Sequence, residues 1–270
     1  MEKEYLGTGQ IAESSRVDNY PGIPGIDGYS LGEKFREHAE SLGVEFTEAQ
    51  VLSLGQKDGI WIIGCDEDIT LESKVVIYAT GCKNRPLGVP GEEKYYGRGL
   101  SFCAVCDGAF YKGKRVAVIG GGDTALDDAM YLSDICEKVY LVHRREFFRG
   151  SASTLEKLKQ KENVEIIVNA RVEEITGDKK IDGIILDNKT KLNISGLFAA
   201  VGMIPQTELL KEFGVLDESN YVKASEDTKT TVNGLFAAGD VRTKQLRQVV
   251  TAAADGANAI YSVMEYLRNI

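Results

Sequence analysis

The feature that most constrains this sequence is a glycine-rich turn, Gly120-Gly121-Gly122-Asp123-Thr124-Ala125, which follows the apolar segment Arg115 to Gly120. A helical pattern, Thr124 to Cys136, opens with the turn. A turn of the form G-x-G-x-x-A between a strand and a helix is typical of a βαβ unit that holds a dinucleotide's pyrophosphate at the helix N-terminus. The alternative is an ordinary tight turn. We therefore expect an α/β nucleotide-binding unit, with candidate cofactor contacts from Gly120, Gly122, Asp123, Thr124 and Ala125.

Basic residues occupy the position that selects the nucleotide. About 20 residues after such a turn, a site for NAD carries Asp or Glu, which binds the ribose 2′-hydroxyl. This sequence instead has His143-Arg144-Arg145, with Arg149 behind them. A guanidinium group can donate two parallel hydrogen bonds to a phosphate, so the cluster favours binding of the 2′-phosphate of NADPH. The alternative is a solvated basic face, and His143 alone is as consistent with a positioning role as with ligand binding.

A pair of cysteines with redox spacing lies shortly before the glycine-rich turn. In Cys103-Ala104-Val105-Cys106, the C-x-x-C spacing brings two thiols within disulfide reach. A zinc site normally needs four Cys or His ligands, and the sequence has 2 histidines and no second C-x-x-C, so we expect no metal. A structural pair of buried thiols is the remaining alternative. Asp107 is adjacent and suited to protonate a leaving thiolate; the alternative is an ordinary turn aspartate before Gly108. The other cysteines, expected to be free, are Cys65, Cys82 and Cys136.

Charge and composition narrow the range of partners. The chain has 270 residues, 43% of them hydrophobic, and a formal net charge of −9, which argues against binding to nucleic acid or to an anionic membrane. We therefore expect a small molecule or a protein as partner. No apolar run approaches the roughly 20 residues that span a bilayer. Since the first residues also lack an apolar signal core, a cytoplasmic location is predicted.

The order of the expected elements indicates a doubly wound α/β fold. An amphipathic helix, Leu31 to Leu42, precedes a hairpin and a strand that ends at Ala79-Thr80-Gly81. After the break Arg85 to Gly91, strands and helices alternate, which is the pattern of a parallel sheet. A second composition break falls at Ser225 to Thr231. The breaks predict an inserted domain, 88–227, between two segments of another domain, 1–87 and 228–270.

Together, these motifs resemble the low-molecular-weight flavoprotein thioredoxin reductases of bacteria, and the resemblance covers essentially the whole chain. The matching motifs are Gly9-Gln10-Ile11, Asn19-Tyr20-Pro21-Gly22, Ala79-Thr80-Gly81, Cys103 to Gly108, Gly120 to Ala125, His143-Arg144-Arg145 with Arg149, Ala238-Gly239-Asp240-Val241, and Arg247-Gln248-Val249. The resemblance implies two Rossmann-like nucleotide-binding domains. Segments 1–87 and 228–270 would form an FAD-binding domain. The NADPH-binding domain, 88–227, would carry the dithiol and rotate to present either the nicotinamide or the disulfide to the flavin.

The resemblance also implies the activity, which is NADPH-dependent reduction of the disulfide of thioredoxin or a thioredoxin-like protein by a homodimer. Cys106 would take electrons from the flavin and attack the acceptor's disulfide, Cys103 would resolve the mixed disulfide, and Asp107 would be the acid. Asp240 would meet the ribityl and phosphate region of FAD. The other implied FAD contacts are Glu2, Gly9, Gln10, Asn19, Thr80, Gly81, Gly239, and, at a helix start facing the flavin, Arg247, Gln248 and Val249.

One departure from the family concerns the beginning of the sequence. The family holds the ADP half of FAD with a strand, a G-x-G-x-x-G loop and a helix, a unit of about 30 residues. Only Met1 to Thr8 precede Gly9 here, and Thr8 replaces the first glycine of a G-G-Q turn. Met1-Glu2-Lys3 resembles the end of the family's second strand, where Glu2 would bind ribose. We therefore expect an N-terminally truncated FAD domain that binds FAD poorly.

Two other functions fit parts of the pattern. A non-catalytic NADPH-binding remnant would keep the inserted domain after losing FAD binding with its N-terminus. A ferredoxin-fed reductase of the same fold is disfavoured, because such proteins lack the nucleotide fingerprint and the arginines present here. The absorbance of bound flavin in the purified protein distinguishes the reductase from the remnant.

Overall fold

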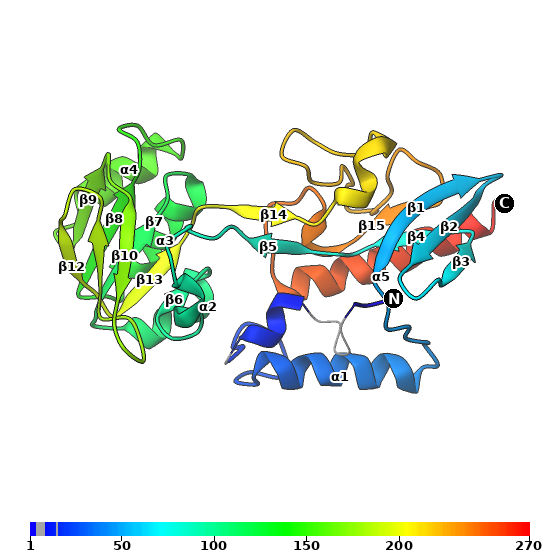
Figure 1. The fold of residues 1–270 in the computed structure, drawn as a ribbon, viewed down its shortest axis with the longest axis horizontal. Helices are drawn as coiled ribbons and strands as arrows, with labels where there is room; N and C mark the ends of the chain where they lie inside the picture. Colours follow the sequence, from blue (N-terminus) through cyan, green and yellow to red (C-terminus); the bar gives the residue numbers. More distant parts are fainter. Residues whose placement is uncertain (4–8, 15) are drawn as a thin grey trace. The chain divides into compact units, whose positions relative to one another are not determined.

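The computed structural model describes residues 1–3, 9–14 and 16–270 of the chain. Thr8, at which the sequence departs from the G-G-Q pattern, lies outside these residues. The chain forms two compact units (Figure 1). The first combines Met1–Lys83 with Ile204–Ile270, and the second is Asn84–Met203. The chain leaves the first unit in β5 (Cys82–Asn84) and returns in β14 (Met203–Pro205).

The boundaries of the units differ from the breaks at 87 and 227 that the sequence predicts. The second boundary comes earlier, because the stretch after β14 contributes to the core of the first unit. Leu210, Val215 and Val222 are fully buried there and share a cluster with Trp61. Burial of these apolar side chains therefore assigns this stretch to the first unit. The composition of the sequence does not change where this stretch begins, so the boundary could not be predicted from it.

The second unit is built on a five-stranded parallel sheet. Its strands, in spatial order, are β6 (Leu100–Ser101), β13 (Gly196–Ala199), β7 (Arg115–Ile119), β8 (Lys138–His143) and β9 (Val164–Val168). The chain runs outward from β7 to β9 and then returns to the other side of β7. Ligands of open α/β sheets bind at the carboxyl ends of the strands beside such a switch point. The predicted parallel α/β fold is confirmed, and the glycine-rich turn follows β7 at this point.

Helices cover one face of this sheet and an antiparallel meander covers the other. The helices are α3 (Asp123–Ser133) and α4 (Ala152–Lys159), and the meander is β10 (Val172–Thr176), β11 (Gly183–Leu186) and β12 (Lys191–Asn193). Val116 and Val118 of β7 are buried with the helices, whereas Ala117 and Ile119 are buried with the meander. Successive strand residues point to opposite faces, so β7 contributes to both cores.

Three short helices complete the second unit: η2 (Glu92–Tyr95), α2 (Ala104–Asp107) and η3 (Gly108–Tyr111). Helix α2 lies against α3. A Cβ atom on Gly108 would lie 2.7 Å from the ring of Tyr131 and 3.0 Å from Leu132, both on α3. The segment with the two cysteines is therefore packed on the helix that begins at the glycine-rich turn.

Among its described residues, the first unit contains two small sheets and two long helices, and the linking strands β5 and β14 pair with each other as a further two-stranded sheet. The elements are α1 (Gly28–Ser41), the antiparallel strands β1 (Val51–Lys57), β2 (Ile60–Cys65) and β3 (Thr70–Ser73), the parallel pair β4 (Val76–Tyr78) and β15 (Leu235–Ala237), α5 (Val249–Leu267), and the short helices η1 (Gly9–Glu13), η4 (Glu208–Phe213) and η5 (Gly239–Val241). Helix α1 corresponds to the predicted helix and begins earlier, because Asp27 caps it by accepting the N–H of Ser30 at 2.9 Å. Within the described ranges, no helix is long and apolar enough to cross a membrane.

Candidate active site

A disulfide joins Cys103 and Cys106 at the start of α2, with the two Cα atoms 5.3 Å apart. Cys103 is the N-cap residue, and its sulfur accepts the N–H of Cys106 at 3.1 Å. Cys65, Cys82 and Cys136 are free and buried. Burial raises the pKa of the Cys82 and Cys136 thiols to about 11, which disfavours the reactive thiolate. The pairing predicted from the C-x-x-C spacing is confirmed.

Asp107, at the end of α2, is half-buried behind the disulfide segment. Its Oδ2 atom accepts the hydroxyl hydrogen of Ser101 at 2.6 Å, and the same hydroxyl oxygen accepts the N–H of Cys103 at 3.1 Å. Burial raises the pKa of Asp107, and the bond from Ser101 partly opposes this effect. A carboxyl group with a raised pKa holds its proton at higher pH, as a general acid requires. Ser101 was not predicted, since no spacing rule connects it to the carboxylate.

The glycine-rich turn is closely packed on one side and open on the other. A Cβ atom on Gly120 would lie 2.4 Å from the carbonyl oxygen of Ala200, and one on Gly121 would lie 2.2 Å from the ring of His143. Gly122, the N-cap residue of α3, has no atom within 4 Å of its Cβ position. No side chain among the described residues caps α3. The first N–H groups of the helix, at Asp123 and Thr124, thus have no side-chain cap, which leaves them available to a phosphate. Ala125 is buried beneath the turn.

His143 is a packing residue of this turn. It is buried at the end of β8, its ring stacks on Phe148 at 4.8 Å, and its Nε2 atom lies 3.2 Å from the carbonyl oxygen of Phe147. Burial is the largest cause of the lowered pKa of His143. The imidazole contacts Gly121 rather than solvent. Of the two roles that the sequence left open for His143, positioning and ligand binding, this contact favours positioning.

The three arginines of the basic cluster, Arg144, Arg145 and Arg149, are exposed. In the part of the chain that the structure describes, none of them forms an ion pair. The backbone N–H groups of Arg149 and Gly150 donate to the carbonyl oxygen of Gly121 at 2.7 and 3.2 Å. The arginine loop is thereby fixed to the glycine-rich turn. Gly150 was not predicted, although a Cβ atom there would lie 2.8 Å from the backbone nitrogen of Asp123.

In the first unit, Asp240 has the unsatisfied acceptor that a cofactor site would need. Its Oδ1 atom is buried and has no hydrogen-bond partner among the described residues. Burial raises the pKa of Asp240, and the charges of Lys244 and Arg247 oppose this rise. A buried carboxylate oxygen without a donor is costly, and a hydroxyl group of a ligand would satisfy it. These properties fit the ribityl hydroxyls of FAD.

Several predicted FAD contacts meet at the start of α5. Arg247 donates to the carbonyl oxygen of Asp240 at 3.2 Å, and its guanidinium stacks on Tyr221 at 4.1 Å. Gln248 is the N-cap of α5, where it forms a capping box with Thr251, and Val249 begins the helix. The amide of Asn19 donates to the side-chain oxygen of Gln248 at 2.7 Å. The structure thus brings together residues that lie 229 positions apart in the sequence.

The remaining predicted contacts of the first unit lie in backbone turns and bridges. The hydroxyl of Thr80 donates to the carbonyl oxygen of Gln206 at 2.6 Å, and Gln206 N–H donates to the carbonyl oxygen of Gly81 at 3.0 Å. Glu2 donates its N–H to Thr47 at 3.0 Å, in a parallel bridge to the segment beside Glu48. Gly9 and Gln10 open η1, with Gln10 half-buried, and no hydrogen bond within the described ranges joins either of them to Asp240.

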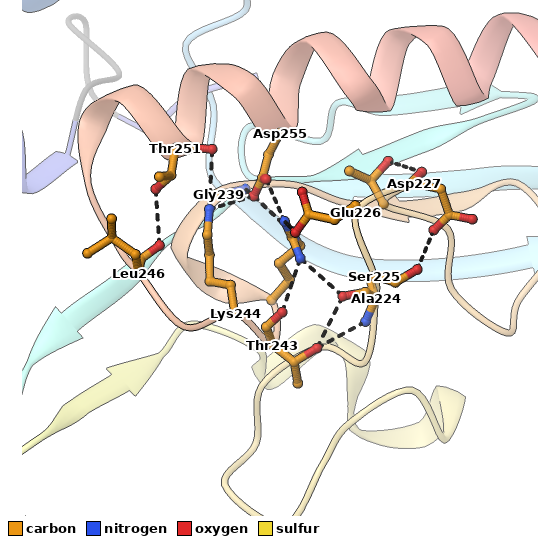
Figure 2. Close-up of polar contacts among 12 residues, drawn as sticks. Ala224, Ser225, Glu226, Asp227, Gly239, Thr243, Lys244, Leu246, Thr251 and Asp255 are labelled. Atoms are coloured by element: carbon orange, nitrogen blue, oxygen red, sulfur yellow. Dashed lines mark hydrogen bonds and ion pairs between the residues drawn. The ribbon is translucent and has the colours of Figure 1, made fainter. Parts of the chain in front are cut away.

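A buried ionic network next to Asp240 was not predicted from the sequence. Figure 2 shows Asp255 of α5 with Gly239 and Lys244 pointing toward its carboxylate. Arg242 also binds this carboxylate, through Nη2 at 2.6 Å and Nε at 2.8 Å. Arg242 and Asp255 are each 2% exposed. Charged side chains in a loop and a helix read as surface residues in a sequence, so no motif indicated their burial.

These features define an α/β oxidoreductase that combines a dinucleotide-type turn with an adjacent redox-spaced disulfide. The sequence matches the pyridine nucleotide-disulphide oxidoreductase family over residues 1–256. It is 40% identical over 273 residues to the thioredoxin reductase of Helicobacter pylori, covering 97% of this chain and 88% of that protein. It is 36% identical over 270 residues to the thioredoxin reductase of Bacillus subtilis, covering 97% and 84%.

A solved structure agrees with these sequence matches. The crystal structure of thioredoxin reductase from Streptococcus pyogenes matches with a TM-score of 0.91 and 36% identity, covering 100% of this chain and 90% of that one. The chain belongs to the pyridine nucleotide-disulphide oxidoreductase family, as a disulfide reductase of the low-molecular-weight thioredoxin reductase type.

Proposed function

We propose that this chain is an NADPH-dependent flavoprotein disulfide reductase, which passes electrons from NADPH through FAD and the Cys103/Cys106 dithiol to thioredoxin or a thioredoxin-like protein. The observation that carries the proposal is the Cys103–Cys106 disulfide, which has Asp107 on the same short helix. Helix α2 packs on α3, so the disulfide and the glycine-rich turn share one scaffold. The likeness to proteins named thioredoxin reductase supports the choice of acceptor.

The proposed NADPH site is the edge of the sheet at the end of β7. The pyrophosphate would meet the uncapped N–H groups of α3, with Gly120, Gly122, Asp123, Thr124 and Ala125 forming the turn around it. The exposed guanidinium groups of Arg144, Arg145 and Arg149 would bind the 2′-phosphate, and His143 would support the turn. The bonds from Arg149 and Gly150 to Gly121 favour this arrangement, because they hold the two parts of the site together.

The proposed FAD site lies in the first unit, around Asp240 and the start of α5. Asp240 would accept a hydroxyl of the cofactor, while Arg247, Gln248 and Val249 would present the positive end of α5 to the flavin. A bound FAD supplies two-electron transfer between the nicotinamide and the disulfide. The family's other FAD contacts map to Glu2, Gly9, Gln10, Asn19, Thr80, Gly81 and Gly239.

The dithiol would reduce its acceptor by thiol–disulfide exchange. Two electrons and two protons convert the Cys103–Cys106 disulfide to two thiols. Cys106 loses its proton to solvent, and its thiolate attacks one sulfur of the acceptor's disulfide; the other acceptor sulfur leaves and takes a proton from Asp107. Cys103 then loses its proton to solvent, and its thiolate attacks the Cys106 sulfur of the mixed disulfide, which restores the Cys103–Cys106 bond; the second acceptor sulfur leaves as a thiolate and takes a proton from solvent, which also reprotonates Asp107. The raised pKa of Asp107 supports its assignment as the acid.

The proposal includes a homodimeric assembly and a cytoplasmic location, as expected from the sequence. It is tested by adding FAD to the purified chain, removing unbound flavin and recording the visible spectrum before and after anaerobic addition of NADPH. Retained flavin that loses its absorbance with NADPH, but not with NADH at the same concentration, is the expected result. Binding of NADPH without any retained flavin would instead favour the non-catalytic remnant.

A further inference from the structure

Asp255, near the start of α5, is the centre of a buried ionic network in the first unit. Its carboxylate accepts hydrogen bonds from the guanidinium of Arg242 at 2.6 and 2.8 Å, from Lys244 Nζ at 2.8 Å and from the backbone N–H of Gly239 at 2.8 Å (Figure 2). Removing one partner from such a network leaves a buried charge uncompensated. The conformation of the loop before α5 therefore depends on Asp255.

The network binds both ends of η5, the turn that contains Asp240. Gly239 opens the turn with a φ of +76°, which favours glycine, and its N–H is held by Asp255. Arg242 follows the turn, and its guanidinium binds the same carboxylate. Asp255 thereby fixes the residues on either side of Asp240 without a hydrogen bond to Asp240 itself.

Two further cations lie near Asp240, and one of them, Lys244, is bound by Asp255. Lys244 and Arg247 are close enough to Asp240 to lower its pKa. Among the described residues, neither donates to its carboxylate. Lys244 Nζ binds Asp255 and the carbonyl oxygen of Thr251, the latter at 3.2 Å, and Arg247 binds the backbone carbonyl oxygens of Asp240 and Arg242 at 3.2 and 3.3 Å. Within the described part of the chain, Asp240 Oδ1 is left buried and without a hydrogen-bond partner.

We propose that Asp255 is a positioning residue for the FAD site: by binding Lys244 and Arg242, it keeps the carboxylate of Asp240 free to accept a hydroxyl of the cofactor. The inference rests on the proposed FAD site. Without the negative charge of Asp255, Lys244 loses its buried partner and turns to Asp240, the carboxylate whose pKa its charge already lowers. A lysine paired with Asp240 competes with the cofactor for the same oxygen.

Asp255→Asn tests the proposal through FAD affinity, measured by quenching of flavin fluorescence when the purified chain is titrated into FAD. We expect FAD affinity to fall about tenfold or more, because Lys244 loses its buried ion pair with residue 255 and then competes with FAD for Asp240. Lys244→Met alone should bind FAD within about threefold of the unsubstituted chain. The double variant Asp255→Asn with Lys244→Met should recover most of the lost affinity, because the competing lysine is gone and the side-chain oxygen of the asparagine can still accept hydrogen bonds from Gly239 and Arg242. A purely structural role for Asp255 predicts no such recovery.

Two controls make the result specific. Glu226 binds the same Arg242 guanidinium at 3.2 Å from the solvent side and is 86% exposed, so Glu226→Gln should leave FAD affinity unchanged. NADPH affinity, a property of the second unit, should be unchanged in every variant.

The possible outcomes separate the inference from the proposed function. No FAD binding by the unsubstituted chain would overturn the FAD site and the inference with it. Normal FAD affinity in Asp255→Asn, or no recovery in the double variant, would overturn the inference alone. If Asp255→Asn fails to fold, the double variant is compared with Lys244→Met. The inference predicts FAD affinities within about threefold of each other, and a loss of about tenfold would contradict it.

Discussion

The hydroxyl of Ser101 donates to Oδ2 of Asp107 across 2.6 Å and accepts the backbone N–H of Cys103. One serine therefore connects the proposed acid to the first cysteine of the disulfide. Ser101 ends β6, at the edge of the parallel sheet, and is 6% exposed, so its position is set by the sheet. The Asp107 carboxylate and the backbone of Cys103 are therefore both held by a residue of β6 rather than by a loop residue.

Removing this hydroxyl should shift the pH dependence of disulfide exchange. Burial raises the pKa of Asp107 and the bond from Ser101 lowers it, so Ser101→Ala should raise the pKa further. A general acid acts in its protonated form, so the alkaline decline of the exchange rate should move to higher pH. The rate at which the reduced chain reduces a disulfide substrate, measured across pH, checks this shift. Ser133→Ala, which removes an equally buried hydroxyl from α3, is the control and should not move the profile.

Asp107→Asn should slow the same exchange by about 100-fold or more at neutral pH, because the amide cannot supply the proton. Binding of NADPH should be unaffected. A rate within about twofold of the unsubstituted chain would exclude Asp107 as the acid.

Loss of Arg144 and Arg145 should change nucleotide preference. Each charge-assisted contact to the 2′-phosphate contributes about 1.5–3 kcal/mol. Arg144→Ala with Arg145→Ala removes two such contacts and should therefore weaken NADPH binding by about 100-fold or more, with NADH binding unchanged. Arg115→Ala is the matched control, since Arg115 lies in the same unit and pairs with Glu137 on the surface. Equal losses for NADPH and NADH in a calorimetric titration would contradict the assignment.

Alanine substitutions at two neighbouring glycines should affect the stability of the second unit and the binding of NADPH separately. Gly121→Ala places a methyl group 2.2 Å from the buried ring of His143, so it should destabilise the second unit by about 1–3 kcal/mol. Gly122→Ala meets no described atom within 4 Å and should lower the unfolding temperature much less, by the small cost of alanine at a helix N-cap. The same methyl group enters the space proposed for the pyrophosphate, so Gly122→Ala should still weaken NADPH binding. Thermal unfolding and nucleotide titration of both variants check these outcomes.

Asp128 on α3 should make the second unit less stable at alkaline pH. Burial, followed by the charge of Asp127, raises its pKa to about 7. A raised pKa in the folded state favours folding while the group is protonated, and this advantage is lost as the pH rises through about 7. Asp128→Asn should therefore raise the unfolding temperature by about 2–4 °C near pH 8 and have little effect near pH 4. Asp127→Asn, at an exposed neighbour, should raise it less, and a larger gain there would refute the burial argument.

The local patterns of the sequence predicted the second unit well. Alternating strands and helices, the turn after β7 and the C-x-x-C spacing are encoded by neighbouring residues, and each has its counterpart in the structure. The contact of Gly121 with His143 and the network around Asp255 depend on residues distant in sequence, so no spacing rule reveals them. For the same reason, the sequence did not reveal that the stretch around Val215 is buried in the first unit.

The most direct test of the account is the consumption of NADPH by the FAD-supplemented chain in the presence of oxidised thioredoxin, compared with the Cys106→Ser variant. The account predicts that each NADPH consumed reduces one thioredoxin disulfide, and that Cys106→Ser, which cannot form the Cys103–Cys106 bond, binds NADPH normally but reduces no thioredoxin. Thioredoxin reduction that persists in Cys106→Ser would contradict the account, as would a flavin-loaded chain that consumes NADPH at the same rate with and without thioredoxin.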